Sequence, residues 1–271
     1  MLSVKLITRA AAAVTISATA AFAADLPQPQ IAYQPVVAVA PASGWYLRGE
    51  IGIGINANPS LVYIPNPANS SDFAIQNAAM GDTVLFGGGI GYQFNNWLRF
   101  DVTADYLSRT PVNAFGIYHY GGGTYGDSYT GFLQSVVLLG NAYIDLGTWN
   151  CLTPFIGVGL GGAFNKLDNF TDVGIGTSGS GIGQNSTNTS FAWALHAGVA
   201  YNVTQNFSVE LAYRYLNYGS VTDIVNCTGG CNPDSYKWEK LSQSDIMLGM
   251  RWMFPVEAPM ALPPPPLQTR G

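Results

Sequence analysis

One pattern constrains this chain more than any other: apolar and polar residues alternate along several runs, and the charges stay on one side. In the run from Asp245 to Phe254, every even position is apolar, whereas the odd positions include Asp245 and Arg251. Side chains alternate across a β-strand, so the run predicts a strand with one apolar and one charged face. A soluble sandwich turns the apolar face inward. A closed barrel in lipid turns it outward and directs polar side chains into its lumen.

Seven earlier segments alternate in the same way and predict an all-β protein. The eight segments are 45–55, 84–94, 98–106, 132–146, 156–161, 191–201, 207–215 and 245–254. Their connections alternate between long and short, as in bacterial outer-membrane barrels. None of the clear apolar faces carries Asp, Glu, Lys or Arg, and a Lys or Arg there would cost about 2–4 kcal/mol at the bilayer midplane. We therefore predict an eight-stranded antiparallel up-and-down transmembrane β-barrel over residues 44–254.

Aromatic residues gather at the strand ends near the short connections, where an interfacial belt is expected. They are Trp45, Phe94, Trp97, Tyr201, Phe207, Trp252 and Phe254. The long connections, 56–81, 107–128, 165–188 and 217–240, are rich in Asn, Ser, Thr, Gly and Tyr. We predict that they form external loops for surface interactions, with strand extensions within 107–128. Val137 and Leu139 are apolar exceptions on an otherwise polar inward face.

The ends of the chain predict export and a periplasmic location for both termini. Residues 1–23 resemble a signal peptide, with Lys5 and Arg9 before an apolar run and Ala21-Phe22-Ala23 as the cleavage pattern. Without Lys5 and Arg9 the chain keeps nine basic and 16 acidic side chains, a net charge of −7, which disfavours nucleic-acid binding. Residues 24–43 form a Pro-rich leader. Residues 255–271 form a Pro-rich tail that could contact the cell wall.

Ten charged residues are predicted to face the lumen. They are Arg48, Glu50, Arg99, Asp101, Asp105, Asp145, Glu210, Arg214, Asp245 and Arg251. The interior of an eight-stranded barrel is just wide enough for side chains to fill, and buried charges are costly unless they are paired. The main interpretation is a closed network of ion pairs. The alternative is a narrow or gated ion path past the inward-facing glycines.

The sequence nominates no catalytic, metal or cofactor site. His196 lies among small inward-facing residues, and no nucleophile or second base is placed beside it by the sequence. Gly157, Gly159 and Gly162 match the spacing of a dinucleotide fingerprint, but no helix follows and we expect them to face the lumen. An enzyme remains the least favoured of the three classes considered.

The cysteines fit an exported protein. Cys227 and Cys231 enclose three residues in the last long connection, and we predict a disulfide between them. A metal site there would need further ligands. Cys151 lies in a short connection and is either a free thiol or an intermolecular partner.

The chain resembles the small porin-like outer-membrane proteins of α-proteobacteria, within the broad outer membrane protein A-type barrel class. The resemblance rests on Ala23-Ala24-Asp25-Leu26-Pro27, on Gly44-Trp45-Tyr46-Leu47 and on the eight-strand rhythm. Gly249, Trp252 and Phe254 resemble the signal that the barrel-insertion machinery recognises, although Met247 departs from it and Phe254 is not terminal. The resemblance implies an outer-membrane surface antigen that supports envelope integrity, or a pore. We predict the former, surrounded by outer-membrane lipid and without a cofactor.

Overall fold

The computed structural model describes residues 43–64, 72–176, 179–228 and 233–254. These ranges contain one antiparallel sheet of 11 strands. The strands are β1 (Gly44–Asn56), β2 (Ser60–Ile64), β3 (Asp72–Met80), β4 (Thr83–Gln93), β5 (Leu98–Tyr120), β6 (Gly123–Asp145), β7 (Leu152–Ile175), β8 (Ser180–Gly183), β9 (Thr187–Asn202), β10 (Phe207–Thr228) and β11 (Asp234–Met253). No described residue belongs to a helix that could span a membrane. The predicted signal peptide, the leader up to residue 42 and the tail lie outside the described residues.

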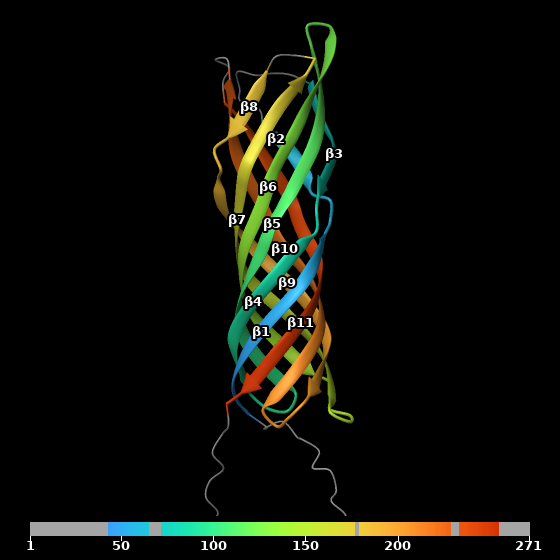
Figure 1. Cartoon of the computed structure of the whole chain (residues 1–271), viewed down its shortest axis with the longest axis vertical. Coiled ribbons are helices and arrows are strands. Elements are labelled where there is room, and N and C mark those ends of the chain that lie inside the picture. The colour runs from blue at the N-terminus through green and yellow to red at the C-terminus, as the bar shows by residue number, and fades with distance from the viewer. Residues whose placement is uncertain (1–42, 65–71, 177–178, 229–232, 255–271) are drawn as a thin grey trace, which may run out of the picture. The chain divides into compact units, whose positions relative to one another are not determined.

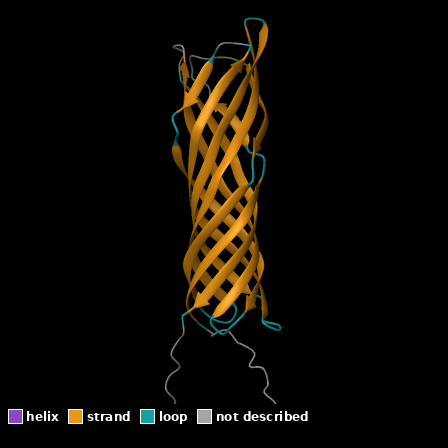
Figure 2. Cartoon of the chain, viewed as in Figure 1, coloured by secondary structure: helices purple, strands orange, loops and turns teal. Residues whose placement is uncertain are grey.

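Eight of the strands close into a ring in the order β1, β4, β5, β6, β7, β9, β10 and β11 (Figures 1 and 2). The first and last strands pair directly, with Arg48 opposite Arg251 and Ile51 opposite Leu248. Each strand of the ring also pairs with the next one along this order. The predicted eight-stranded up-and-down barrel is therefore confirmed.

Three short strands extend the ring beyond the ends of β1, β4 and β9. β2 pairs with β11, β3 pairs with β5, and β8 lies between β7 and β10. The other five ring strands are 20 to 24 residues long and run through both parts of the barrel. We call the part that contains β1, β4 and β9 the basal half, and the part that contains β2, β3 and β8 the distal half.

The long external connections contain more strand than the sequence predicted. The strand extension expected within 107–128 is present as the β5–β6 hairpin, but most described residues of 165–188 and 217–240 are also in strands. The alternation persists there with its polarity reversed: Leu133 and Leu167 face inward and are buried, whereas Gln134 and Lys166 face outward. A search for lipid-type strands misses such segments because their apolar side chains point into the barrel.

The basal end of the barrel carries the short turns. Asn95 closes the turn between β4 and β5, because its side-chain Oδ1 accepts hydrogen bonds from the backbone N–H of Trp97 at 2.9 Å and of Leu98 at 2.8 Å. Thr204 Oγ1 accepts from the backbone N–H of Phe207 at 3.0 Å in the turn between β9 and β10. β1 begins and β11 ends at this same end (Figure 1).

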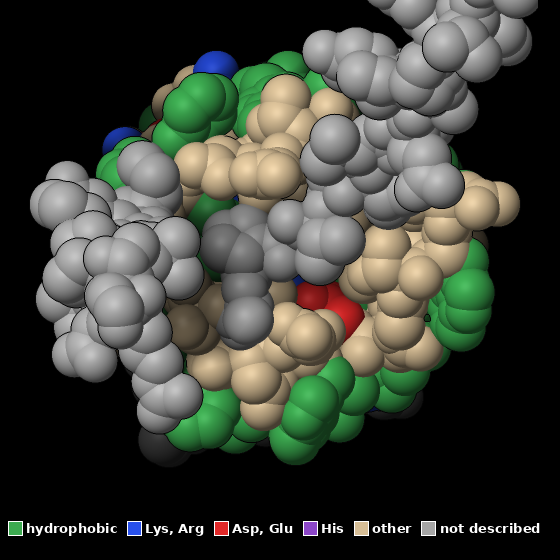
Figure 3. All heavy atoms as spheres, turned by 90° about the horizontal axis from the view of Figure 1, so that it is seen from below, with side chains coloured by type: hydrophobic (Ala, Val, Ile, Leu, Met, Phe, Trp, Pro, Cys, Tyr) green, Lys and Arg blue, Asp and Glu red, His purple; other side chains and the backbone are tan. Residues whose placement is uncertain are grey.

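The outer wall of the basal half is apolar. Its large outward side chains are 39% to 64% exposed and include Leu47, Ile51, Ile53, Phe86, Ile90, Phe100, Val102, Leu138, Val158, Leu160, Phe191, Leu195, Val199, Leu211, Ile246, Leu248 and Met250. Aromatic side chains such as Trp45, Trp97 and Trp252 are exposed near its lower rim. Figure 3, seen from this end, shows hydrophobic side chains around the rim and acidic side chains within the opening. A wall of this kind is suited to lipid rather than water.

The interior changes character between the two halves. Polar and charged side chains fill the basal half, whereas the distal half contains a hydrophobic core that includes Tyr129, Leu167, Phe170 and Trp238. The ring of Phe170 lies 6.3 Å from that of Trp238, 6.1 Å from that of Tyr129 and 5.9 Å from that of Tyr236 (centroid to centroid). The charged residues are therefore concentrated in the basal half, and large aromatic and aliphatic side chains make up much of the distal interior.

Val137 and Leu139 are the residues that mark this change. They stood out in the sequence as apolar exceptions on an inward polar face, and they are 0% and 1% exposed. Both belong to the buried hydrophobic core. They are inward core residues on β6, whose inward face nearer the basal end carries Asn141 and Asp145.

Candidate functional site

The polar layer of the basal half is built over two strands, β4 and β7, in which several consecutive inward positions are glycine. Gly87, Gly89 and Gly91 alternate along β4, and a Cβ at Gly87 would overlap the carboxylate of Asp105. A Cβ at Gly91 would overlap the ring of Tyr46. The glycines therefore create space that side chains from neighbouring strands occupy.

The inward glycines of β7 also leave space for side chains of a neighbouring strand, here β6. A Cβ at Gly157 would overlap the ring of Tyr143, and one at Gly159 would overlap the side chain of Asn141. The ion path suggested past these glycines would thus run through positions that Tyr143, Asn141 and Asp105 fill.

Arg214 organises the upper part of the charged layer. Its guanidinium bonds Asp245 through Nε at 2.6 Å, bonds Asp105 through Nη1, and lies 3.7 Å from Glu50. Asp245 also accepts a hydrogen bond from Gln243 at 2.6 Å. Three carboxylates on three other strands are thus held by one arginine whose side chain is 0% exposed.

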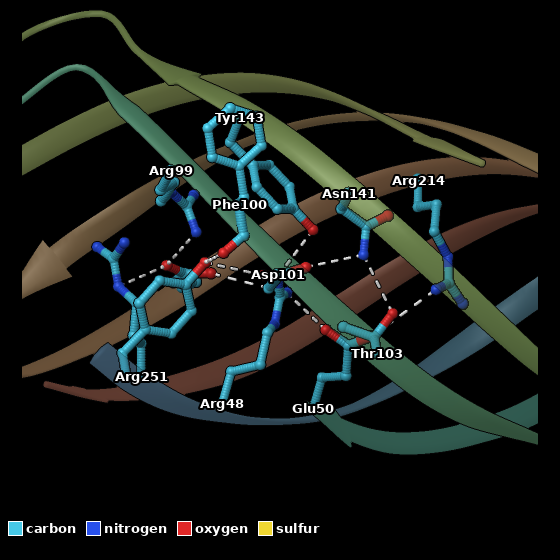
Figure 4. Close-up of polar contacts among 12 residues, drawn as sticks. Arg48, Glu50, Arg99, Phe100, Asp101, Thr103, Asn141, Tyr143, Arg214 and Arg251 are labelled. Carbon is cyan, nitrogen blue, oxygen red and sulfur yellow. Dashed lines mark hydrogen bonds and ion pairs between the residues drawn. The ribbon is translucent and has the colours of Figure 1, made fainter. Parts of the chain in front are cut away.

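Arg48 links the upper part to the middle (Figure 4). Its Nη2 donates to Glu50 at 2.6 Å, and its Nη1 donates to Asp101 at 2.9 Å and to the hydroxyl of Tyr143 at 2.8 Å. Glu210 lies 3.8 Å from the same Nη2. Because Glu50 contacts both Arg48 and Arg214, the two groups form one network.

The lower part is centred on Glu210. Its carboxylate lies 3.5 Å from Arg99 Nη1 and 3.3 Å from Arg251 Nε. Arg99 also donates to Asp145 at 3.1 Å, and its guanidinium carbon lies 4.3 Å from the ring centroid of Tyr143. The planar cation is therefore paired at its edge and stacked on an aromatic face.

Two neutral side chains complete the network around Asp101. Asn141 Nδ2 donates to Asp101 at 2.8 Å and to Thr103 Oγ1 at 3.1 Å, and Tyr46 donates its hydroxyl proton to Asp101 at 3.0 Å. The alternation along their strands puts Tyr46, Asn141 and Tyr143 on inward faces, but alternation alone does not indicate that they bond to the charged residues.

All ten charged residues predicted for the lumen lie in this layer. Each is 8% exposed or less, and each takes part in at least one ion pair with another member of the set. The layer holds four arginines and six carboxylates. Such an arrangement fixes the strands to one another, because each arginine pairs with at least one carboxylate on another strand.

The other motifs do not form a reactive centre. His196 is buried, with its ring 5.2 Å from that of Tyr143, and no hydrogen bond from it to a nucleophile is present within the described residues. Gly162 faces outward between the exposed Leu160 and Phe164, so the expectation that it faces the lumen was wrong. The segment continues as β7 rather than turning into a helix, as a dinucleotide site requires. In the described ranges no three His, Cys, Asp or Glu residues are grouped in a way that could hold a metal ion.

The residues predicted as an assembly signal lie near the end of β11. Trp252 and Phe254 are exposed on the outer wall, and Gly249 lies opposite Glu50 on one side and Glu210 on the other. Their recognition during insertion stays a prediction. Met247 is 1% exposed and faces inward.

Cys151 and Cys227 lie at opposite ends of the barrel. Cys227 is disulfide-bonded, and Cys231 lies outside the described residues. Cys151 is a free cysteine in the basal turn between β6 and β7.

A smaller polar cluster lies among the aromatic rings of the distal half. Tyr236 donates to Asp172 at 3.0 Å, and Tyr129 donates to Asp127 at 3.3 Å. The two hydroxyls are 3.4 Å apart. Burial, followed by the negative charge of Asp127, raises the pKa of Asp172 to about 7.

Comparison with known proteins gives the family. Residues 10–254 match the outer membrane protein beta-barrel domain. An uncharacterized protein of Brucella abortus is 31% identical over 223 residues, which cover 74% of this chain and 76% of the relative. Outer membrane protein PagN of Salmonella typhimurium is 29% identical over 78% of this chain and 90% of its own length.

A protein of Rickettsia conorii that is named as a candidate adhesin is 26% identical over 77% of this chain and 81% of its own length. The apolar outer wall and the short turns at one end agree with the family match. In outer-membrane barrels the short turns face the periplasm, so the distal half faces the cell exterior. The chain belongs to the outer membrane protein beta-barrel domain family and is an outer-membrane protein of the Gram-negative type.

Proposed function

We propose that this protein is a non-conducting surface barrel that supports the cell envelope and presents its distal half for interactions outside the cell. The observation that carries the proposal is the filled interior. Ten paired charges occupy the basal half, and a hydrophobic core occupies the distal half. Ions would have to cross both layers, and the second layer offers them little hydration.

A narrow pore is the competing function. Arg99 and Asp101 are the residues that it would use, and both are 4% exposed or less. Asp101 accepts hydrogen bonds from Arg48, Asn141 and Tyr46, so moving it aside would leave several buried donors without an acceptor. Leaving buried polar groups unpaired costs about 1–3 kcal/mol each, which favours the closed state.

Planar-bilayer recording with the purified full chain tests the closed lumen. We expect no reproducible conductance from the wild type. Two variants serve as a matched pair: Arg99→Gln removes a positive charge, and Asp101→Asn removes a negative charge. A stable wild-type conductance whose ion selectivity shifts in opposite directions in these two variants would establish the pore and refute the closed barrel.

The outer wall of the distal half supports the surface-interaction part of the proposal. Several apolar side chains of the distal half are 40% to 57% exposed on its outer wall, on β2, β8 and the distal parts of β7 and β10: Ile64, Ile182, Val173, Ile175 and Ile224. Apolar side chains exposed together in this way are typical of interaction sites. The similarity to a candidate adhesin of Rickettsia conorii is consistent with this role.

Two assays on cells separate the envelope role from the surface role. Deletion of the gene should increase sensitivity to detergent, and both the wild type and an Ile182→Ser, Ile224→Ser variant should restore resistance. The same variant should lose adhesion to cultured host cells. If deletion leaves detergent sensitivity unchanged, the envelope role is wrong; if the variant adheres as the wild type does, the surface role at these residues is wrong.

Catalysis has no support in the geometry of the described residues. His196 would need a nucleophile or a carboxylate within hydrogen-bonding distance, and within the described residues its buried Nε2 has no hydrogen-bond partner. Of the relatives described above, PagN is named as an outer membrane protein and the Rickettsia conorii protein as a candidate adhesin.

A further inference from the structure

A row of polar side chains crosses the outer wall on three adjacent strands, β5, β6 and β7, where the basal half meets the distal half. The ladder between β5 and β6 shifts register between Leu107 and Thr110, so Ser108 and Arg109 share the position opposite Gln134. Gln134 lies directly opposite Lys166 on β7. Arg109, Gln134 and Lys166 therefore form one row on the outer wall, which we call the rim row.

The outward row immediately below is the upper edge of the lipid-facing wall. Tyr106, Val136 and Phe164 lie opposite one another in the same two ladders. Val136 is 39% exposed and Phe164 is 43% exposed. The rim row thus stands at the level where outer-leaflet headgroups meet their acyl chains.

The Arg109 guanidinium stacks on an aromatic ring but is not paired with a carboxylate within the described residues. Its guanidinium carbon lies 3.8 Å from the ring centroid of Phe132, the outward residue above Gln134. Within the described residues, no carboxylate lies within ion-pair distance of Arg109. Stacking fixes the plane of a guanidinium and leaves its edge, which matches the oxygens of a phosphate, free to bind.

Of the two cations in the rim row, only Lys166 forms an ion pair within the described residues. Lys166 Nζ lies 3.0 Å from Asp168, and the lysine side chain is 44% exposed, so part of its donor capacity faces solvent. Asp82 is the other outward carboxylate near this level, and it forms no ion pair with Arg109. Gln134 accepts a hydrogen bond from Tyr106 at 3.4 Å, which leaves its amide N–H groups free to donate.

We infer that the rim row is a binding site for the phosphate of an outer-leaflet glycolipid, with Arg109 as the main ligand and Gln134 and Lys166 as supporting donors. The acyl chains of the same molecule would lie against Tyr106, Val136 and Phe164. The lipid assignment rests on the position of the rim row directly above an apolar row. A lipid would contact both rows, whereas a free phosphate would contact only the rim row. The site does not depend on whether the lumen conducts or on what the distal half binds.

Lipid binding to the full chain refolded in detergent micelles tests the inference. The probe is lipopolysaccharide that carries its glucosamine phosphates, compared with the same preparation after enzymatic dephosphorylation. The variants are Arg109→Gln and Lys166→Gln. Lys237→Gln is the matched control, because Lys237 is also outward and pairs with a carboxylate, Glu239, at 2.8 Å, but on β11. Heat-modifiable gel mobility verifies that each variant is folded.

Native mass spectrometry and titration should show that the wild type retains the phosphorylated lipid. Arg109→Gln should weaken its affinity about tenfold, as expected for loss of a charge-assisted hydrogen-bonded contact. Lys166→Gln should weaken it less, and Lys237→Gln should leave it unchanged. Equal affinity for the dephosphorylated lipid, or equal effects of Arg109→Gln and Lys237→Gln, would overturn the site. Competition by millimolar inorganic phosphate that displaces the lipid would identify a free-phosphate site instead and would overturn the lipid assignment.

Discussion

Single side chains in the lumen share their partners, so the loss of one affects several strands. Arg214 contacts carboxylates from β1, β5 and β11, and Glu210 contacts arginines from β1, β5 and β11. Breaking a buried ion pair by removing one member costs about 3–5 kcal/mol, because the remaining charge stays buried. Exposed pairs usually contribute about 0–1 kcal/mol.

The Arg214→Met variant should therefore lower the free energy of unfolding by about 3–5 kcal/mol, because Asp105, Asp245 and Glu50 lose their shared cation. Lys237→Met, which breaks an outward pair with both side chains 35% exposed, should change it by less than about 1 kcal/mol. Urea titration of the barrel in lipid vesicles measures both. Equal losses would show that the lumenal network is not the stabilising element.

The inward glycines give a second test at this scale. Gly157→Ala places a methyl group where the ring of Tyr143 lies, so we expect the barrel to lose stability by about 1–3 kcal/mol, as in other overpacked interiors. Gly140→Ala is the control, because Gly140 faces outward and the nearest heavy atom to its Cβ would be 3.8 Å away. Thermal shifts of gel mobility compare the two, and a Gly157→Ala barrel as stable as Gly140→Ala would mean that the space beside Gly157 is open.

The sequence predicted which residues face the lumen but not which residues meet. Alternation assigns a face to each residue, and all ten charges follow it. Pairing depends on the register between strands and on strands that are several ladders apart. Arg48 on β1 reaches Asp101 on β5 across β4, and the glycines of β4 make that contact available. A single sequence contains no direct signal for either property.

β11 shows both faces of a membrane strand. Leu248 is 54% exposed on the outer wall, and Asp245 is 0% exposed in the lumen. Leu248→Arg should destabilise the folded barrel by about 2–4 kcal/mol, the cost of a cation near the bilayer midplane, whereas Leu248→Met should have little effect. Unfolding in lipid vesicles measures the difference, and the placement of β11 in lipid is wrong if both variants match the wild type.

Phe254 tests the role predicted for the end of the same strand. Phe254→Ala should slow assembly in cells with little change in the stability of the folded protein, because Phe254 is an exposed outward residue outside the lumenal network. The measurement is the rate at which the heat-modifiable form appears after a pulse of synthesis. Val199→Ala, another exposed outward position, is the control. Assembly of Phe254→Ala at the rate of this control would remove Phe254 from the signal.

The distal strands carry a pH dependence through Asp172. The folded pKa of about 7 lies above the ordinary value of 3.8, so the folded state holds the proton more tightly. Stability of the distal half is therefore greatest below about pH 4, falls as the pH rises toward 7, and levels off above it. Hydrogen exchange of the amides of β7 and β11 between pH 4 and 8, corrected for intrinsic rates, measures this trend. Asp172→Asn should reduce this pH dependence. If the variant keeps the full pH dependence of the wild type, other carboxylates such as Asp127 cause it.

At the scale of the whole barrel, one cylinder of strands has two opposite polarities. The alternation of polar and apolar residues identified the basal half because apolar residues face outward there. Most strands of the distal half were not predicted, because their apolar residues, such as Leu133 and Leu167, face inward as in a soluble protein. In both halves apolar residues recur at every second position. The face they occupy changes from outward to inward near Val137 and Leu139.

The continuous strands of the distal half also change the thermodynamics of recognition outside the cell. Exposed residues such as Ile182 and Ile224 stand on hydrogen-bonded ladders rather than on open loops. Ordering a loop residue costs about 1–2 kcal/mol in backbone entropy, a cost that a partner of a mobile loop must offset at each encounter. Here the backbone is already ordered when the barrel folds, so a partner need not order it. A small contact area on the outer wall of the distal half can therefore support measurable affinity.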